Sequence, residues 1–191
     1  PMRRLIKAKK VLTPLEEIAD CFVAVEDGKI VAVSCDKPPY KHDYEFLDAG
    51  DKIVAPGFID LHIHGSFGID IMEGTVQAIK HLSNYLIAHG VTAFLPTTWA
   101  APWEQTQKVI QAIAMAIAEG VEGAQPLGVH LEGPYLSQAK KGAQPEEGIL
   151  SPNDLMYEHI LTKYEDIVKI MVLAPELEGA EKLVRSLKAH R

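Results

Sequence analysis

Apolar and polar residues alternate at a period of two over much of the first 54 residues, which is the pattern of β-strands with one buried face. Strands are predicted at residues 5–8, 20–25, 29–34 and 51–54. Asp27 and Gly28 separate the second run from the third, and an Asp-Gly pair accepts the positive φ angles of a two-residue hairpin. We therefore expect a small β module over residues 1–54.

After Pro56 and Gly57 the spacing changes, and short apolar runs alternate with stretches whose apolar residues recur every three or four positions. The short runs predict strands at residues 58–64, 91–97, 126–132 and 167–174. The longer stretches predict helices at residues 75–89, 102–119, 152–163 and 179–190. Ser151 and Asp154 form a capping pattern at the start of the third helix. Four successive strand–helix units predict an α/β domain with parallel strands over residues 55–191.

Such units belong either to an open doubly wound sheet or to an eight-stranded barrel, and the spacing alone fits both. No G-x-G-x-x-G sequence follows the first of these strands, which argues against a dinucleotide-binding fold. Polar residues at the carboxyl ends of two strands favour the barrel, because barrel active sites lie at that end.

The strand at residues 58–64 places its polar residues on one face. Strand side chains alternate between faces, so Asp60, His62 and His64 share one face. The aliphatic residues of the other face should pack under helices: Ile59, Leu61 and Ile63. Two imidazoles two residues apart on a strand converge on one ion, and neutral histidine is a common ligand of zinc-like metals. We predict that His62 and His64 bind a metal, with Asp60 either a further ligand or a group that orients a ligand imidazole.

The strand at residues 126–132 ends at the same predicted rim. Glu132 is its last residue, and a carboxylate there could complete a metal site or bridge two metals. His130 lies one layer deeper on the same face and is expected to be a hydrogen-bonded residue beneath the site. The following loop, residues 138–147, is polar and rich in Gly and Pro, which suits a binding loop over the barrel mouth. Its Lys140 and Lys141 could attract a phosphate or could simply be solvated.

Composition excludes some classes of function. The 19 basic and 26 acidic residues give a net charge of −7, and no run of basic residues is present, so nucleic acid is not an expected partner. No apolar segment is long enough to span a membrane. Two cysteines, Cys21 and Cys35, suit structural thiols in a reducing cytoplasm better than a disulfide framework.

Several segments together resemble one family. Residues 56–65, Pro-Gly-Phe-Ile-Asp-Leu-His-Ile-His-Gly, resemble the first-strand signature of the amidohydrolase superfamily, which includes dihydroorotases and allantoinases. The His-Leu-Glu-Gly-Pro-Tyr of residues 130–135 and the Lys-Gly-Ala-Gln-Pro of residues 141–145 more narrowly resemble N-acetylglucosamine-6-phosphate deacetylases. Residues 90–98 and 173–176 are similar to the same family.

This resemblance implies the first half of a TIM-like (β/α)8 metal-dependent hydrolase barrel, preceded by a small β-sandwich module that later strands complete. It also implies a cytoplasmic enzyme of amino-sugar catabolism. Such an enzyme removes acetate from N-acetylglucosamine 6-phosphate, leaving glucosamine 6-phosphate. A homodimer is expected.

The resemblance also implies site residues. By position, Glu132 matches the family's metal-binding glutamate, and His62 and His64 match a pair that holds a second metal in some members. Keeping both histidines implies a centre for one or two divalent ions, zinc or iron. Ala143 and Gln144 match loop positions that contact the sugar. The catalytic aspartate and the phosphate-gripping residues are expected on later strands, so no catalytic residue is assigned within these 191 residues.

A closed barrel typically needs about 250 residues, so four strand–helix units should be inactive alone. Two other interpretations stay open at this point. One is an amidohydrolase acting on a cyclic amide, although such relatives more often place a carboxylated lysine where Glu132 stands. The other is a catalytically inactive half-barrel that serves in assembly.

Overall fold

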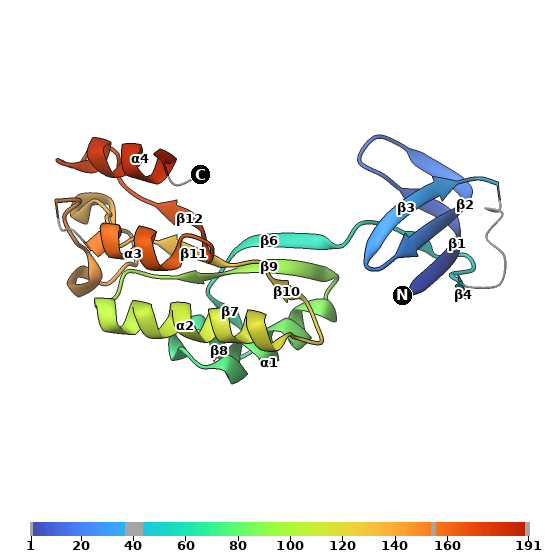
Figure 1. Ribbon diagram of the computed structural model, residues 1–191, viewed down its shortest axis with the longest axis horizontal. Coiled ribbons are helices and arrows are strands. Elements are labelled where there is room, and N and C mark those ends of the chain that lie inside the picture. Colours follow the sequence, from blue (N-terminus) through green and yellow to red (C-terminus); the bar gives the residue numbers. More distant parts are fainter. Residues whose placement is uncertain (1, 37–43, 154–155, 190–191) are drawn as a thin grey trace. The chain divides into compact units, whose positions relative to one another are not determined.

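The computed structural model describes residues 2–36, 44–153 and 156–189. The chain divides into two compact units, Pro1–Pro56 and Gly57–Arg191, a boundary two residues after the one predicted. Each unit has its own sheet and its own buried core (Figure 1).

The first unit is a five-stranded sheet. Its strands are β1 (Arg3–Leu12), β2 (Glu17–Glu26), β3 (Lys29–Ser34), β4 (Glu45–Asp48) and β5 (Ile53–Val54). They lie in the order β3-β2-β1-β4, with β5 also paired to β1. Strand β1 runs antiparallel to β2 and parallel to β4 and β5. The described strands form one sheet, so the composite β-sandwich stays a prediction.

The predicted hairpin is confirmed. Asp27 and Gly28 have φ angles of 47° and 78°, and Glu26 pairs with Lys29 across the turn. The buried hydrophobic residues of this unit lie on β1 and β2 and are Leu5, Ala8, Val11, Cys21, Val23 and Ala24. Strand β4 was not predicted from the sequence, because all four of its residues are exposed and its pattern shows no buried face.

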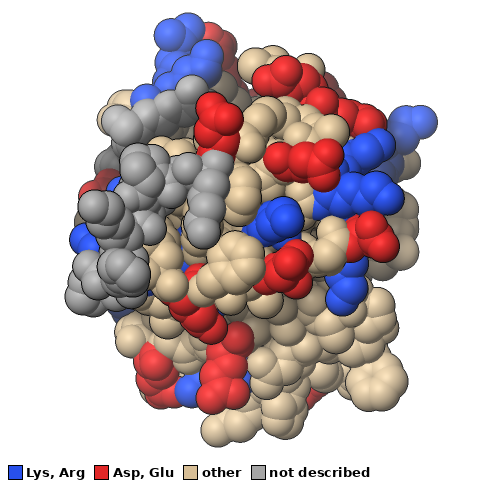
Figure 2. All heavy atoms as spheres, turned by 90° about the vertical axis from the view of Figure 1, so that its right-hand side faces the viewer, with Lys and Arg blue, Asp and Glu red and all other residues tan. Residues whose placement is uncertain are grey.

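Charged residues of both signs lie on the surface of this unit. Acidic and basic side chains are interspersed on the face shown in Figure 2. Several of them pair across strands, including Arg4 with Glu45 at 2.9 Å and Lys10 with Glu17 at 2.8 Å. Such exposed pairs contribute little to stability, so the unit depends on its small apolar core.

The second unit is a parallel sheet covered by helices. Its main strands are β6 (Phe58–Ile63), β9 (Val91–Thr98), β10 (Gln125–Pro126), β11 (Val129–Glu132) and β12 (Val168–Val172). Its α-helices are α1 (Val76–Ile87), α2 (Trp103–Glu119), α3 (Met156–Tyr164) and α4 (Ala180–Ala189). A short hairpin, β7 (Gly65–Ser66) and β8 (Ile69–Asp70), follows β6 and leads into the 3-10 turn η1 (Ile71–Glu73). Two more 3-10 turns, η2 (Gln138–Lys140) and η3 (Glu146–Gly148), lie in the loop after β11.

The strands of this unit follow one another in space as they do along the chain. Strand β6 pairs with β9, β9 with β10 and β11, and β11 with β12, all of them parallel. A doubly wound sheet reverses its strand order at a switch point, and these strands show no such reversal. The order matches consecutive strands of a (β/α)8 barrel, while closure of that barrel stays a prediction.

The core of this unit lies between β9 and the two long helices α1 and α2, which run beside one another (Figure 1). Ile79 and Leu82 of α1, Ile110 and Ile113 of α2 and Phe94 of β9 are fully buried. Thr75 caps α1 by accepting a hydrogen bond from the Ala78 amide. None of the helices among the described residues is both long and apolar enough to cross a membrane.

Two details differ from the sequence prediction. The strand expected at residues 126–132 is interrupted at Leu127 and Gly128, giving β10 and β11. The helix expected to begin at Pro152 is described from Met156 onward, while Pro152 and Asn153 lie in a turn in which Ser151 accepts a hydrogen bond from the Asn153 amide. The capping residue Asp154 lies outside the described residues.

The predicted apolar face of β6 is also partly wrong. Ile63 packs against the core, but Ile59 and Leu61 are 59% and 52% exposed. Among the described strands β6 pairs only with β9, and its register shifts twice along that pairing. Strand β6 is therefore an edge strand among the described residues, and its outer face is less covered than the faces of the strands within the sheet.

The core makes a direct prediction about stability. Replacing Ile113 with Ala should lower the free energy of unfolding by about 2–5 kcal/mol, because it leaves a cavity among fully buried side chains. Met115→Ala on the same helix is the matched control, since Met115 is 54% exposed, and should change it by about 0.5 kcal/mol or less. Urea unfolding followed by circular dichroism measures both. Equal effects of the two substitutions would contradict this description of α2.

The two cysteines should differ in reactivity. Cys21 is fully buried and Cys35 is exposed. Burial raises the pKa of the Cys21 thiol, and the neighbouring Cys35 raises it further. With iodoacetamide at neutral pH, mass spectrometry should find Cys35 modified first, and both cysteines modified only after unfolding in urea. Equal rates in the folded protein would contradict this arrangement.

Candidate metal centre

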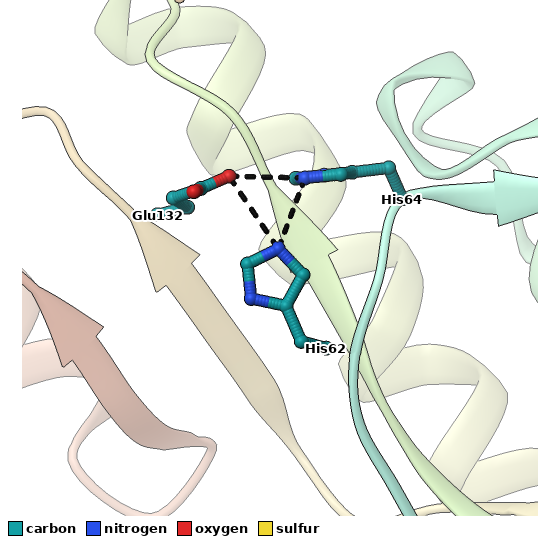
Figure 3. Close-up of side chains that lie close together, drawn as sticks. All are labelled: His62, His64 and Glu132. Carbon is teal, nitrogen blue, oxygen red and sulfur yellow. Dashed lines mark hydrogen bonds and ion pairs between the residues drawn. The ribbon is translucent and has the colours of Figure 1, made fainter. Parts of the chain in front are cut away.

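Three side chains that could bind a metal converge at one edge of the parallel sheet (Figure 3). His62 lies near the end of β6, His64 directly follows that strand, and Glu132 is the last residue of β11. The Nε2 atoms of His62 and His64 are 3.2 Å apart. Oε2 of Glu132 lies 3.0 Å from Nε2 of His64 and 3.6 Å from Nε2 of His62.

The fold accounts for this convergence. Parallel strands end at a common edge, so the last residues of β6 and β11 meet although about seventy residues separate them in sequence. Gly65 turns the chain immediately after His64, with a φ of 146°. A Cβ atom at this position would lie 2.0 Å from the carbonyl oxygen of Ile69, so only glycine allows the β7–β8 hairpin to close beside the centre.

The backbone fixes how His64 is presented. Its Nδ1 lies 3.1 Å from the carbonyl oxygen of Thr97, at the end of β9. A carbonyl can only accept, so Nδ1 carries the hydrogen and Nε2 of the neutral ring keeps its lone pair. That lone pair points toward Glu132 and His62 (Figure 3). A metal-binding histidine is typically held in this way, by a hydrogen bond from its other ring nitrogen to a carbonyl or carboxylate.

The three atoms could hold a cation between them. A proton on Nε2 of His62 would satisfy one of the three contacts, whereas a cation among the three atoms satisfies all of them. A tetrahedral ion at about 2.0–2.2 Å from its ligands keeps those ligands roughly 3.3–3.6 Å apart. The observed separations of 3.0, 3.2 and 3.6 Å are close to that range. Two nitrogens and one oxygen of this kind fit a divalent metal such as zinc.

The centre is open to solvent among the described residues. The side chains of His62 and His64 are 43% and 37% exposed, and that of Glu132 is 25% exposed. Three protein ligands with an open side are characteristic of catalytic rather than structural metal sites. A pocket of about 240 Å³ adjoins Glu132 and is lined by loop residues that include Lys140, Lys141 and Gln144.

Two other predicted residues lie beside the centre. Oδ1 of Asp60 accepts a hydrogen bond from the backbone amide of His62 at 3.1 Å. His130 is buried beneath the site, and its Nδ1 donates to the carbonyl oxygen of Leu61 at 2.7 Å. Its ring meets that of His62 edge to face, with centroids 4.8 Å apart. Asp60 therefore holds the strand that carries His62, and His130 supports that strand from below.

The loop after β11 brings one further side chain to the centre. Nε2 of Gln144 donates to Oε2 of Glu132 at 2.9 Å. Its neighbour Ala143 is exposed on the same loop. Lys141 donates to the carbonyl oxygen of Gln144, so its ammonium holds the loop, whereas Lys140 is exposed. The sequence analysis singled out Gln144 but not its contact with Glu132. It did not predict the backbone partners at Thr97 and Leu61, because every residue type carries the same carbonyl group.

Comparison with known proteins places this geometry in context. The model of the amidohydrolase family matches residues 53–181. An N-acetylglucosamine-6-phosphate deacetylase of Bacillus subtilis is 35% identical over 187 residues, covering 96% of this chain and 47% of that protein. An N-acetylgalactosamine-6-phosphate deacetylase of Escherichia coli O157:H7 is 31% identical over 187 residues, covering 98% of this chain and 48% of that protein.

Solved structures agree with these relatives. The crystal structure of N-acetylglucosamine-6-phosphate deacetylase from Pasteurella multocida superposes with a TM-score of 0.84 at 25% identity, covering 98% of this chain and 48% of that chain. The chain thus spans about half the length of the relatives it matches. Since the family match extends over most of the chain and includes His62, His64 and Glu132, the chain belongs to the amidohydrolase family.

Proposed function

We propose that the protein carrying this chain hydrolyses the acetamide of N-acetylglucosamine 6-phosphate, giving glucosamine 6-phosphate and acetate. The observation that carries this proposal is the convergence of His62, His64 and Glu132 at the carboxyl edge of a parallel sheet. The similarity to deacetylases over nearly the whole chain supports the choice of substrate. Residues 55–191 would form the first four strand–helix units of a (β/α)8 barrel, and residues 1–54 part of a composite β-sandwich.

His62, His64 and Glu132 would hold the metal, which we propose to be zinc or iron, as one or two ions. When bound, such an ion polarises the amide carbonyl and lowers the pKa of a coordinated water toward about 7. The neutral imidazoles and the carboxylate supply donors of the right kind at the right separations. Gln144 donates a hydrogen bond to Oε2 of Glu132, and the Nε2 atoms of both histidines lie within 3.6 Å of the same oxygen.

The remaining residues of this chain would orient the reacting groups. Asp60 and His130 keep β6 in place, which aims His62 and His64 at a common point. The exposed Ala143 and the amide of Gln144 lie where they could contact the sugar, beside the pocket next to Glu132. Hydrolysis also needs a group that transfers a proton to the leaving amine. We propose that the carboxylate of an aspartate outside these 191 residues transfers this proton.

The wider setting follows from the same proposal. A small amino-sugar phosphate is the expected partner, without nucleic acid or membrane, in a homodimer in the cytoplasm. The two thiols support a reducing compartment, since Cys21 and Cys35 are both free. The galactosamine isomer is a second candidate substrate, favoured by the relative from Escherichia coli O157:H7. A cyclic amide is less well supported, because Glu132 supplies the carboxylate at the strand end.

The first test concerns Glu132. In the natural protein supplied with zinc or iron, Glu132→Gln should reduce acetate release from N-acetylglucosamine 6-phosphate by more than the roughly 10–100-fold expected for loss of an outer partner of a ligand. The matched control is Glu147→Gln, an exposed carboxylate in the same loop, which should act as the parent does. Turnover by Glu132→Gln at the parent rate would contradict the proposal. If the parent protein hydrolyses the galactosamine isomer faster, that isomer replaces N-acetylglucosamine 6-phosphate as the proposed substrate.

The second test concerns the two histidines. The double substitution His62→Gln and His64→Gln should remove one ion per chain, measured by inductively coupled plasma mass spectrometry after equilibration with a limiting metal concentration. The matched control is His89→Gln, since His89 follows the end of α1 and its ring contacts Tyr85, through a hydrogen bond to the carbonyl oxygen and a contact between the rings. An unchanged metal content in the double variant would contradict the assignment of these ligands.

A further inference from the structure

The side-chain amide of Gln144 joins two different parts of the second unit. Its Oε1 accepts a hydrogen bond from the backbone amide of Ala100 at 2.8 Å, just beyond the end of β9. Its Nε2 donates to Oε2 of Glu132 at 2.9 Å, at the end of β11. One amide group therefore spans from the β9–α2 connection to the carboxylate of the metal centre.

The contact with Ala100 fixes the orientation of this amide. A backbone N–H can only donate, so the oxygen of Gln144 must face Ala100 and the NH2 group must face Glu132. Glu132 consequently receives a hydrogen-bond donor on the same oxygen that faces both histidines. A donor on this oxygen holds the carboxylate in one rotamer.

The loop that carries Gln144 is itself held in place. Lys141 donates its Nζ hydrogen to the carbonyl oxygen of Gln144 at 3.0 Å, and it lies 3.7 Å from Glu146. Gly148 is buried against the chain at Ala100, where a Cβ atom would lie 2.2 Å from the carbonyl carbon of Ala100. The loop thus lies directly on the β9–α2 connection. Gln144 is held between two contacts of this loop, that of Lys141 with its carbonyl oxygen and that of Gly148 with Ala100.

We propose that Gln144 is a positioning residue of the metal centre, whose amide holds Oε2 of Glu132 toward His62 and His64. This inference rests on the proposed metal centre and adds a role to that of a sugar contact. The NH2 group of Gln144 has a second hydrogen, so a contact with substrate is compatible with it. The side chain of Glu132 is one-quarter exposed, so without this donor it is free to turn toward solvent.

The test measures metal binding directly. In the natural protein freed of metal, Co²⁺ is titrated into the parent, Gln144→Met and Gln138→Met. Methionine keeps the length of glutamine and removes both hydrogen bonds, and Gln138 is an exposed glutamine of the same loop. We expect Gln144→Met to bind Co²⁺ about 10–100-fold more weakly, the usual effect of losing the partner of a metal ligand. Its visible absorption bands at saturating Co²⁺ should also shift, because the ligand geometry changes.

Several outcomes would overturn the proposal. Co²⁺ affinity within about twofold of the parent with unchanged bands, together with a raised KM, would leave Gln144 as a contact for the sugar only. Should Gln144→Met fail to fold by circular dichroism, Gln144→Asn answers the same question, since its amide is one methylene too short to reach both Ala100 and Glu132. Parent-like affinity and bands in Gln144→Asn would then overturn the role.

Failure of the underlying metal centre is recognised separately. Glu132→Gln is titrated in the same series. If it binds Co²⁺ as the parent does, the centre itself is wrong, and the role of Gln144 is overturned with it. If Glu132→Gln loses binding while Gln144→Met keeps it, only the positioning role is wrong.

Discussion

His62, His64 and Glu132 form a group of side chains that could hold a metal ion, and several contacts of the second unit hold these side chains in place. Two imidazole nitrogens and a carboxylate oxygen lie within 3.6 Å of one another. The carbonyl oxygen of Thr97 accepts the ring hydrogen of His64 at Nδ1. Nε2, which faces the other two groups, then carries no hydrogen in the neutral ring. Strand register brings the donors together, and backbone hydrogen bonds determine which of their atoms point inward.

The parts of this arrangement come from three strands that lie side by side in the sheet. Strand β6 carries the two histidines, β9 supplies the carbonyl oxygen that orients one of them, and β11 ends in the carboxylate. The loop after β11 returns to the end of β9, where Gln144 accepts a hydrogen bond from the Ala100 amide. Since Gln144 also donates to Glu132, its side chain links the ends of β9 and β11. Because each link involves a neighbouring strand, the centre requires the strand order that the sheet shows, without a reversal.

Much of this could be predicted from residue types, and the rest could not for identifiable reasons. The alternation of histidines at positions 62 and 64 and the carboxylate at the end of the next polar strand were sufficient to bring His62, His64 and Glu132 together, as the structure does. The exposure of Ile59 and Leu61 follows from the place of β6 at the edge of the described sheet, which residue types alone do not show. The turn at Pro152 and Asn153, where a helix was expected, contains a hydrogen bond from the Asn153 amide to Ser151 that residue types alone do not distinguish from a helix cap.

A crystal of the protein grown with zinc, with anomalous diffraction measured on both sides of the zinc absorption edge, tests the central claim most directly. The account predicts a peak at about 2.0–2.2 Å from Nε2 of His62, Nε2 of His64 and Oε2 of Glu132. Strong zinc peaks elsewhere, with none among these three atoms, would contradict it.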